Sequence, residues 1–189
     1  MRVPPGCGYH AGPMGSFYTQ VLVRGADQHR CADVMRTLRR ASYVIPPRNG
    51  ITVVCDRQSE EQDLEVLDSV AATLSARLDA DTTAVLNHDD DWLVFRHFRK
   101  GAFAGGLQVG RTPLSLRGSI ERLRVTVNPR APSLPLYLAL LRPRMFQVRR
   151  HADLIAALGA PERSLGVGYN YIAKNDVPGF FDRAGILET

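Results

Sequence analysis

The spacing of apolar and polar residues near the start of the chain predicts a strand followed by a helix. Ser16–Arg24 alternates loosely between the two kinds of residue, as a strand does, and Gly25 ends the run. From Ala26 to Ser42 the spacing changes to the three-to-four-residue repeat of an amphipathic helix. The apolar stripe of that helix comprises Cys31, Val34, Met35, Leu38 and Ala41.

A hairpin is predicted next, because two runs rich in β-forming residues flank a turn. The runs are Tyr43–Ile45 and Ile51–Cys55. Between them, the pair Asn49-Gly50 favours the positive φ angles that a tight hairpin turn requires.

A second helix is predicted by a capping box and an apolar stripe. Ser59–Gln62 has the capping-box spacing, in which Ser59 caps the first turn. The stripe comprises Leu64, Leu67, Val70, Ala71, Leu74 and Leu78. Thr82–Leu86 and Trp92–Arg99 then predict two strands joined by a polar turn.

The predicted order β-α-β-β-α-β, with one extra strand, indicates an α+β fold. Two right-handed crossovers place both helices on one face of an antiparallel sheet, the ferredoxin-like βαββαβ sandwich. We predict this domain over residues 15–100, after a disordered leader over 1–14 whose prolines and glycines break any helix. Met14 is an alternative start of translation.

Residues 101–148 predict an irregular segment rich in arginine and proline. Arg122–Val127 is compatible with a strand, and Leu134–Leu141 with a short strand or a helix. The prolines that interrupt both are Pro129, Pro132, Pro135 and Pro143. A helical C-terminal extension over 149–189 begins with the amphipathic run Arg149–Leu158.

The net charge of +5 originates in one part of the chain. Residues 101–150 hold nine arginines and a single acid, Glu121, a balance of 9 − 1 = +8, while the remainder carries 15 basic and 18 acidic residues, or −3. Nucleic acid is therefore a partner to consider. The densest basic residues, our candidate nucleic-acid-binding site, are Arg142, Arg144, Arg149 and Arg150.

Several function classes lack their signatures. No apolar run approaches the roughly 20 residues of a membrane span, so we expect no membrane partner, and without a signal peptide we expect a cytoplasmic protein. Cys7, Cys31 and Cys55 lack metal-ligand spacing, and Cys55 lies in an apolar strand without a basic neighbour. No catalytic motif is present, and Gly166-Val-Gly168 is a weaker match to a nucleotide loop than to a backbone bend.

The densest group of chemically active side chains is the turn Asn87–Asp91. Carboxylates at a turn can bind a divalent cation, so His88, Asp89 and Asp91 are candidate metal ligands, and such a cation is the one cofactor considered. We favour the alternative, a polar turn whose aspartates bond local amides, because adjacent strand side chains point to opposite faces. His97 could also join His88 as a zinc-binding or acid–base pair.

Several short stretches carry a resemblance. They are Phe17–Thr19, Tyr43-Val44, Gln62-Asp63, Asn87–Asp91, Leu158–Pro161 and Gly166–Tyr169. These motifs resemble a family of uncharacterised bacterial proteins with an Asn-His-Asp-Asp-Asp turn. The resemblance supports the predicted domain, implies no activity, and does not extend to residues 101–146.

Residues 101–146 are therefore either a divergent insertion or a frameshifted stretch. The 22 arginines against two lysines fit a GC-rich gene, in which a shifted frame yields acid-poor peptide rich in Arg, Pro, Leu and Ser.

From these patterns we expect a non-catalytic interaction or regulatory module. Its partner would be another protein, which pairs with an exposed sheet face or an edge strand. One alternative is a nucleic-acid-binding protein that uses residues 142–151. The other is a divalent-metal-dependent enzyme at His88–Asp91, for which no catalytic residue can be assigned.

Overall fold

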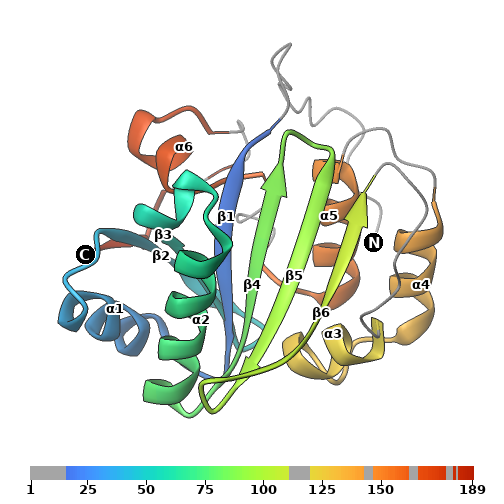
Figure 1. Ribbon diagram of the computed structural model, residues 1–189, viewed down its shortest axis with the longest axis horizontal. Coiled ribbons are helices and arrows are strands. Elements are labelled where there is room, and N and C mark those ends of the chain that lie inside the picture. Colours follow the sequence, from blue (N-terminus) through green and yellow to red (C-terminus); the bar gives the residue numbers. More distant parts are fainter. Residues whose placement is uncertain (1–15, 111–119, 143–146, 162–165, 178–180, 182) are drawn as a thin grey trace.

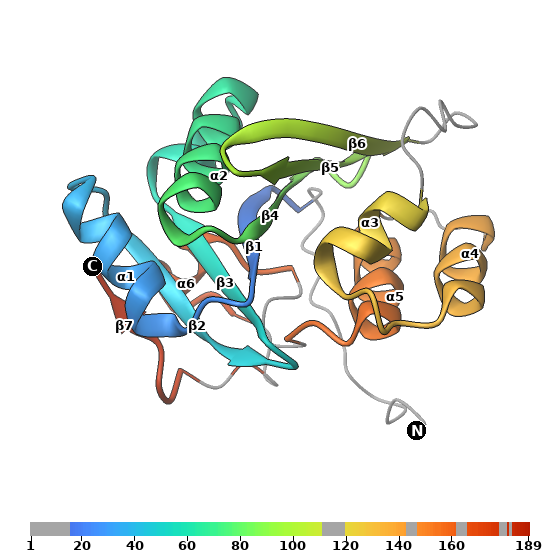
Figure 2. The same cartoon turned by 90° about the horizontal axis from the view of Figure 1, so that it is seen from below.

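The computed structural model describes residues 16–110, 120–142, 147–161, 166–177, 181 and 183–189, and these form one sheet between two layers of helices (Figures 1 and 2). The strands are β1 (Tyr18–Arg24), β2 (Ser42–Arg48), β3 (Ile51–Asp56), β4 (Asp81–His88), β5 (Trp92–Arg99), β6 (Ala102–Gly110) and β7 (Leu187–Glu188). The helices are α1 (Gln28–Thr37), α2 (Leu64–Leu78), α3 (Ile120–Val127), α4 (Ser133–Leu141), α5 (Gln147–Leu158) and α6 (Tyr169–Lys174), with a short 3₁₀ helix η1 (Gln58–Glu61).

The sheet is antiparallel, and its seven strands follow the order β6-β5-β4-β1-β3-β2-β7. Helices α1 and α2 cover one face, and α3, α5 and α6 cover the other, with α4 packed outside α3 and α5 (Figure 2). The α+β prediction is confirmed, but the sheet is larger than predicted. Helices lie on both faces, but β5 and β6 still expose Trp92 and Phe103 on the side of α2, so the expected exposed sheet face is present only at this edge.

Alternating side chains of the central strand fill the two layers. Val21 and Val23 of β1 face α1 and α2, whereas Leu22 between them belongs to the core under α3 and α5. All three are buried. A strand with apolar residues on both faces lacks the strict alternation of a half-buried strand, which explains the loose pattern of this segment.

Most of the predicted elements before residue 100 are confirmed. Asn49 and Gly50 have φ of 51° and 75° at the β2–β3 turn, as the hairpin prediction requires. Helix α1 is shorter than predicted, because Leu38 ends it and Arg39 adopts a φ of 53°.

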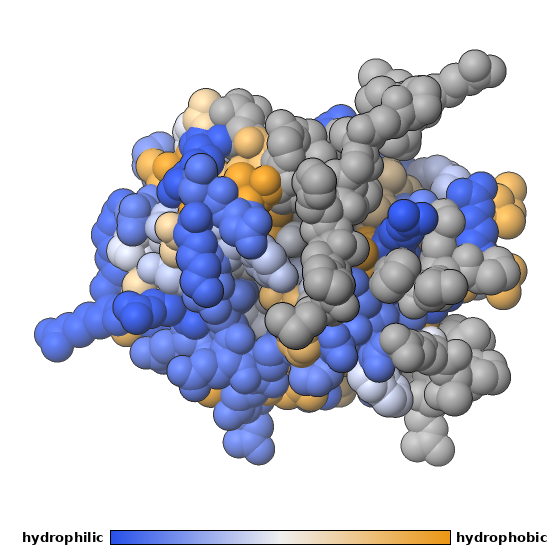
Figure 3. Space-filling view, turned by 90° about the horizontal axis from the view of Figure 1, so that it is seen from above, coloured by the Kyte–Doolittle hydropathy of each residue, from blue (hydrophilic) through white to orange (hydrophobic). Residues whose placement is uncertain are grey.

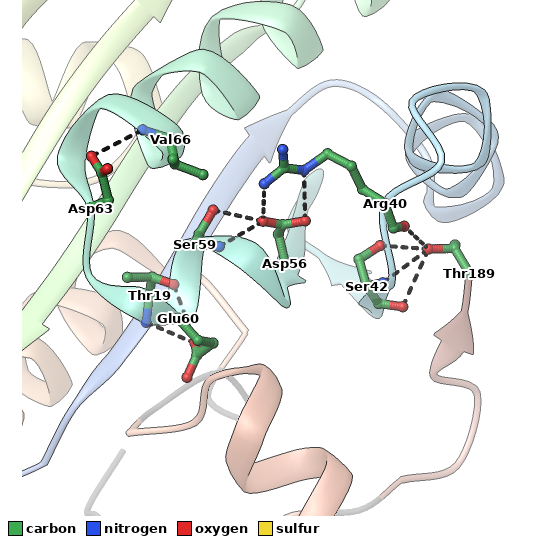
Figure 4. A network of polar contacts seen from close by, with 9 residues as sticks. All are labelled: Thr19, Arg40, Ser42, Asp56, Ser59, Glu60, Asp63, Val66 and Thr189. Atoms are coloured by element: carbon green, nitrogen blue, oxygen red, sulfur yellow. Dashed lines mark hydrogen bonds and ion pairs between the residues drawn. The ribbon is translucent and has the colours of Figure 1, made fainter.

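The predicted capping box of α2 is wrong (Figure 4). Ser59 lies in η1, where its backbone N and Oγ donate to Oδ2 of Asp56 at 2.9 and 2.7 Å. Asp63 is the N-cap of α2, and its Oδ1 accepts from the backbone N of Glu65 at 2.8 Å and of Val66 at 3.4 Å. Ser59 cannot cap α2, because its hydroxyl is held by Asp56 and Asp63 occupies the N-cap position.

Residues 101–148 are more regular than predicted, since they contain β6, α3 and α4. The strand interpretation of Arg122–Val127 is wrong, because Leu123 and Val127 are buried one helical turn apart. Pro135 is the third residue of α4, a position whose N–H has no partner within a helix, so proline is tolerated there.

Several apolar side chains of α3 and α4 belong to the core. Those that are buried are Ile120, Leu123, Val127, Leu136, Ala139 and Leu140. The same two helices also expose Val125, Leu134 and Leu141, so the divergent insertion and the frameshift both stay predictions.

The C-terminal extension is helical at first but ends in the sheet. Strand β7 pairs with β2, with Leu187 opposite Val44. The predicted leader over 1–14, including Cys7, lies outside the described residues. In the part of the chain that is described, no helix is long and apolar enough to cross a membrane.

Candidate functional site

The acidic turn between β4 and β5 is tied to helix α5 through Asp90. Asp89 and Asp90 have φ of 52° and 53°, a left-handed conformation that aspartate tolerates. The Asp90 side chain is buried. Its Oδ1 accepts from Asn87 Nδ2 at 2.8 Å and from the backbone N of Val148 at 3.1 Å, and its Oδ2 accepts from the backbone N of Ser16 at 3.2 Å. Its carbonyl also accepts the amide of the first residue of α5 at 3.1 Å.

The predicted metal ligands have other surroundings. Asp89 is exposed. Nδ1 of His88 lies 2.7 Å from Oε1 of Gln62, and the ring centroids of His88 and Phe17 lie 5.1 Å apart with the two rings nearly perpendicular. Across the described residues, no three His, Cys, Asp or Glu side chains are grouped to hold a metal ion. The proposed site of His88, Asp89 and Asp91 therefore stays a prediction without a supporting cluster.

His97 does not meet His88. The strand register pairs His97 with Thr83 and His88 with Trp92, at opposite ends of the hairpin, so the predicted histidine pair is wrong. The His97 ring is buried, with Nδ1 at 3.1 Å from Thr83 Oγ1. Burial and the nearby positive charge of Arg122 lower the pKa of His97 to about 4, so its imidazole is neutral at physiological pH.

A second buried histidine, His151, belongs to the predicted basic segment 142–151, and its assignment to a basic surface is wrong because it is fully buried. His151 of α5 stacks on Tyr18 of β1, and its Nδ1 lies 2.6 Å from the Tyr18 hydroxyl. Burial lowers the pKa of His151 to about 3. The two residues are 133 positions apart, so no local pattern could pair them.

Glu60 caps helix α6 at the weak nucleotide-loop motif. Thr19 donates to its Oε1 from the backbone N at 3.1 Å and from Oγ1 at 3.2 Å. Burial raises the pKa of the Glu60 carboxyl. Hydrogen bonds from the backbone N–H groups of Thr19, Tyr169 and Asn170 favour the charged form and partly offset this rise. A Cβ at Gly168 would collide with Oε1, so this glycine serves the close approach of a carboxylate, not of a phosphate.

Among the residues that the structure describes, neither an activated nucleophile nor an enclosed substrate pocket is indicated. Burial raises the pKa of the Cys55 thiol well above its ordinary value, which opposes thiolate formation. Two open hollows, of about 220 and 290 Å³, lie beside Tyr171 and beside Asp81. Both are smaller than the clefts of about 300–1,000 Å³ that hold small molecules.

The predicted basic cluster is divided. Arg142 and Arg149 are exposed, but Arg150 is buried, where its guanidinium donates to Gln147 Oε1 at 3.1 Å and to the Arg142 carbonyl at 3.2 Å. Arg144 lies outside the described residues. Two of the four arginines are therefore placed to contact a phosphate.

The most unusual surface is the outer face of α4, which the sequence analysis did not single out. It exposes 68% of Leu134, 43% of Tyr137, 45% of Leu138 and 72% of Leu141. The sequence alone could have indicated this surface. Ser133–Leu141 is apolar on every side, and a helix of that kind is normally buried all round.

Comparison with protein-family models, curated proteins and solved structures finds no match. Inference about function therefore depends on the geometry of this chain.

Proposed function

We propose that the protein is a non-catalytic interaction or regulatory module that binds another protein through the outer face of α4. The observation that carries this proposal is the set of four large apolar side chains exposed on one helix. Single exposed apolar residues are common, but a contiguous group marks an interaction surface.

The scaffold we propose is a ferredoxin-like core with added strands. The central order β4-β1-β3-β2 and the placement of α1 and α2 on one face support it, since split βαβ crossovers produce this arrangement. Strands β5 and β6 extend one edge and β7 extends the other.

The edge strand β6 is a less suitable contact than α4. Arg122 Nη1 donates to the Ala104 carbonyl at 2.7 Å, so a group of this strand is already engaged. Gly105 has a φ of 137°, and the register with β5 shifts between His97 and Phe98. Bulges and covered groups are how proteins discourage strand addition at an edge.

The alternative functions have less support. Of the predicted nucleic-acid-binding arginines, Arg142 and Arg149 are exposed. The exposed face of α4 next to Arg142, however, carries leucines where a nucleic-acid-binding surface would place further phosphate contacts. A metal-dependent enzyme at His88–Asp91 has no cluster of ligands among the described residues.

The test places a photo-crosslinking phenylalanine analogue at Tyr137, an exposed aromatic position where it fits without repacking. In cells of the organism that encodes the protein, we expect discrete adducts that disappear when Leu141→Glu is added. The matched control carries the analogue at Leu64 of α2, which is 39% exposed and lies in the other helical layer. Equal adducts at both positions, or none at Tyr137, would refute the proposal.

A further inference from the structure

The exposed apolar residues of α4 form one continuous stripe. Leu134, Tyr137, Leu138 and Leu141 have the spacing i, i+3, i+4 and i+7, which places them on one side of the helix over about 10 Å. In Figure 3, orange surface appears at the right-hand margin, the side on which Figure 1 places α4. The opposite side of the helix is already packed in the core through Leu136, Ala139 and Leu140. A rotation of α4 about its own axis would therefore not hide the apolar stripe, because it would expose the apolar residues that are now packed in the core.

An exposed arginine lies beyond each end of α4. Arg130 precedes α4 and Arg142 follows it, and both are exposed. Neither forms an ion pair with another of the described residues. The single acid of this part of the chain, Glu121, accepts from Arg124 Nε at 2.7 Å and is therefore already paired.

We infer that the partner of α4 presents an amphipathic helix with an apolar stripe flanked at both ends by aspartate or glutamate. This inference rests on the proposed function and adds the chemistry of the partner. A straight stripe on a convex helix packs best against a second helix, ridge into groove. Carboxylates at the ends of that helix would meet Arg130 and Arg142.

A second copy of this chain does not meet these requirements. A two-fold pairing of α4 with itself brings Arg142 of one copy toward Arg130 of the other, or like residues together, and Glu121, the single acid between residues 101 and 150, is already paired. Juxtaposed like charges oppose such a contact. A membrane surface fits less well, because interfacial helices carry basic residues along the whole polar face, whereas that side of α4 is packed in the core.

The experiment selects ligands for the full chain from a displayed library of helical peptides. Apolar residues are fixed at i, i+3, i+4 and i+7, and the flanking positions are random. Clones that also bind a Leu138→Glu/Leu141→Glu variant are removed. We expect acidic residues to be enriched at the flanks, and the selected peptides to bind that variant at least about tenfold more weakly than the parent.

A charge exchange supplies the decisive control. In an Arg130→Glu/Arg142→Glu variant, the same library should yield lysine and arginine at the flanks. Leu64→Glu on α2 should leave peptide binding unchanged, and circular dichroism should report the same fold for every variant. Neutral or basic flanks selected by the parent chain would overturn the inference.

Other occupants give distinct results, each of which also overturns it. A dimer in sedimentation analysis that is lost in Leu138→Glu identifies a second copy. Binding of anionic phosphatidylglycerol vesicles, with no peptide selected, identifies a membrane. Thermal destabilisation of Leu138→Glu/Leu141→Glu, again without peptides, identifies another segment of this chain. Crosslinks at Tyr137 without acidic flanks would leave the proposed function standing and reject only the partner chemistry.

Discussion

The face of the sheet under α1 and α2 buries hydroxyls and one carboxylate, Asp56, which is paired with Arg40 at 2.6 Å, whereas the face under α3, α5 and α6 buries two neutral histidines. On the first face, hydroxyls of Thr52, Thr82 and Ser75 donate to the carbonyls of Ala26, Ala71 and Ala80 at 2.7 to 2.8 Å. On the second face the ionisable groups are Tyr18, Glu60, Asp90, His97 and His151.

This difference teaches that the two layers depend differently on solution conditions. A hydroxyl that donates to a carbonyl keeps its proton at every pH that a protein experiences. A histidine buried as the neutral imidazole must take up a proton on unfolding in acid, which couples stability to pH. Mild acid should therefore act chiefly on the face that holds both buried histidines, His97 and His151.

The largest expected effect is acid destabilisation. The pKa values of His97 and His151 fall from 6.5 to about 4 and about 3 in the folded protein, so between pH 6.5 and those values only the unfolded chain binds the protons. Their stabilising contribution is complete above pH 6.5 and is lost as the pH falls. We expect the free energy of unfolding to decrease by roughly 2 kcal/mol per histidine between pH 7 and pH 5, measured by urea unfolding.

Two variants test this assignment. His97→Gln and His151→Gln should each remove about half of the pH dependence. The raised pKa of Glu60 acts in the opposite direction, because the folded protein then binds a proton more readily than the unfolded chain. Glu60→Gln should therefore steepen the acid dependence. An unchanged slope in the double histidine variant would assign the effect to other groups.

Apolar truncations on the two faces should have similar effects. Leu74 of α2 and Leu154 of α5 are both fully buried. Leu74→Ala and Leu154→Ala should each lower the free energy of unfolding by about 3 kcal/mol at pH 7, by loss of burial and creation of a cavity. Calorimetry should show one transition in both variants. A separate early transition in Leu154→Ala would mean that α5 unfolds independently of the sheet.

The acidic turn offers a matched pair of substitutions. Asp89 and Asp90 share a left-handed backbone that asparagine also tolerates, but only Asp90 is buried. Asp90→Asn should cost about 2 kcal/mol, because one acceptor oxygen of a buried network is lost. Asp89→Asn should change stability by less than about 0.5 kcal/mol. Thermal melts with and without Mg²⁺ would measure both effects and test the metal hypothesis, since an ion held by Asp89 would raise the midpoint of the parent and of Asp90→Asn but not of Asp89→Asn.

The smallest expected effect is at an exposed ion pair of α1. Arg36 Nη1 lies 2.8 Å from Asp33 Oδ1, and both side chains are at least half exposed, at 50% and 72%. Solvent screens such a pair, so Arg36→Ala should change the free energy of unfolding by less than about 0.5 kcal/mol in chemical denaturation. A larger loss would show that Arg36 contributes more than a solvent-screened ion pair to the stability of α1.

The face under α1 and α2 was predictable because its elements alternate with short connections. The stripe of Leu67, Val70, Ala71 and Leu74 indicated both a helix and its buried side. Sequence periodicity reports such local amphipathicity directly. Helix ends were less reliable, because Asp63 and Ser59 compete as caps within a few residues.

The opposite face was not predictable in the same way. Tyr18 and His151, or Asp90 and Val148, are linked by contacts that span 133 and 58 positions. No periodicity encodes such a contact. In α4, apolar residues on both sides of the helix remove the contrast on which pattern analysis depends, and prolines concealed its start.

The hydrogen bonds of Asp90 also have a consequence for the order of assembly. The β4–β5 hairpin is local, and can close early, while the amides at the start of α5 find their acceptors only on the completed turn. Contacts that close long loops form late on a folding pathway. We therefore expect α5 to dock after the hairpin. Until α5 docks, Tyr18 and Phe95 would lack the His151 ring that packs against both, so the hydrogen bonds of one aspartate complete the cover of the central strands.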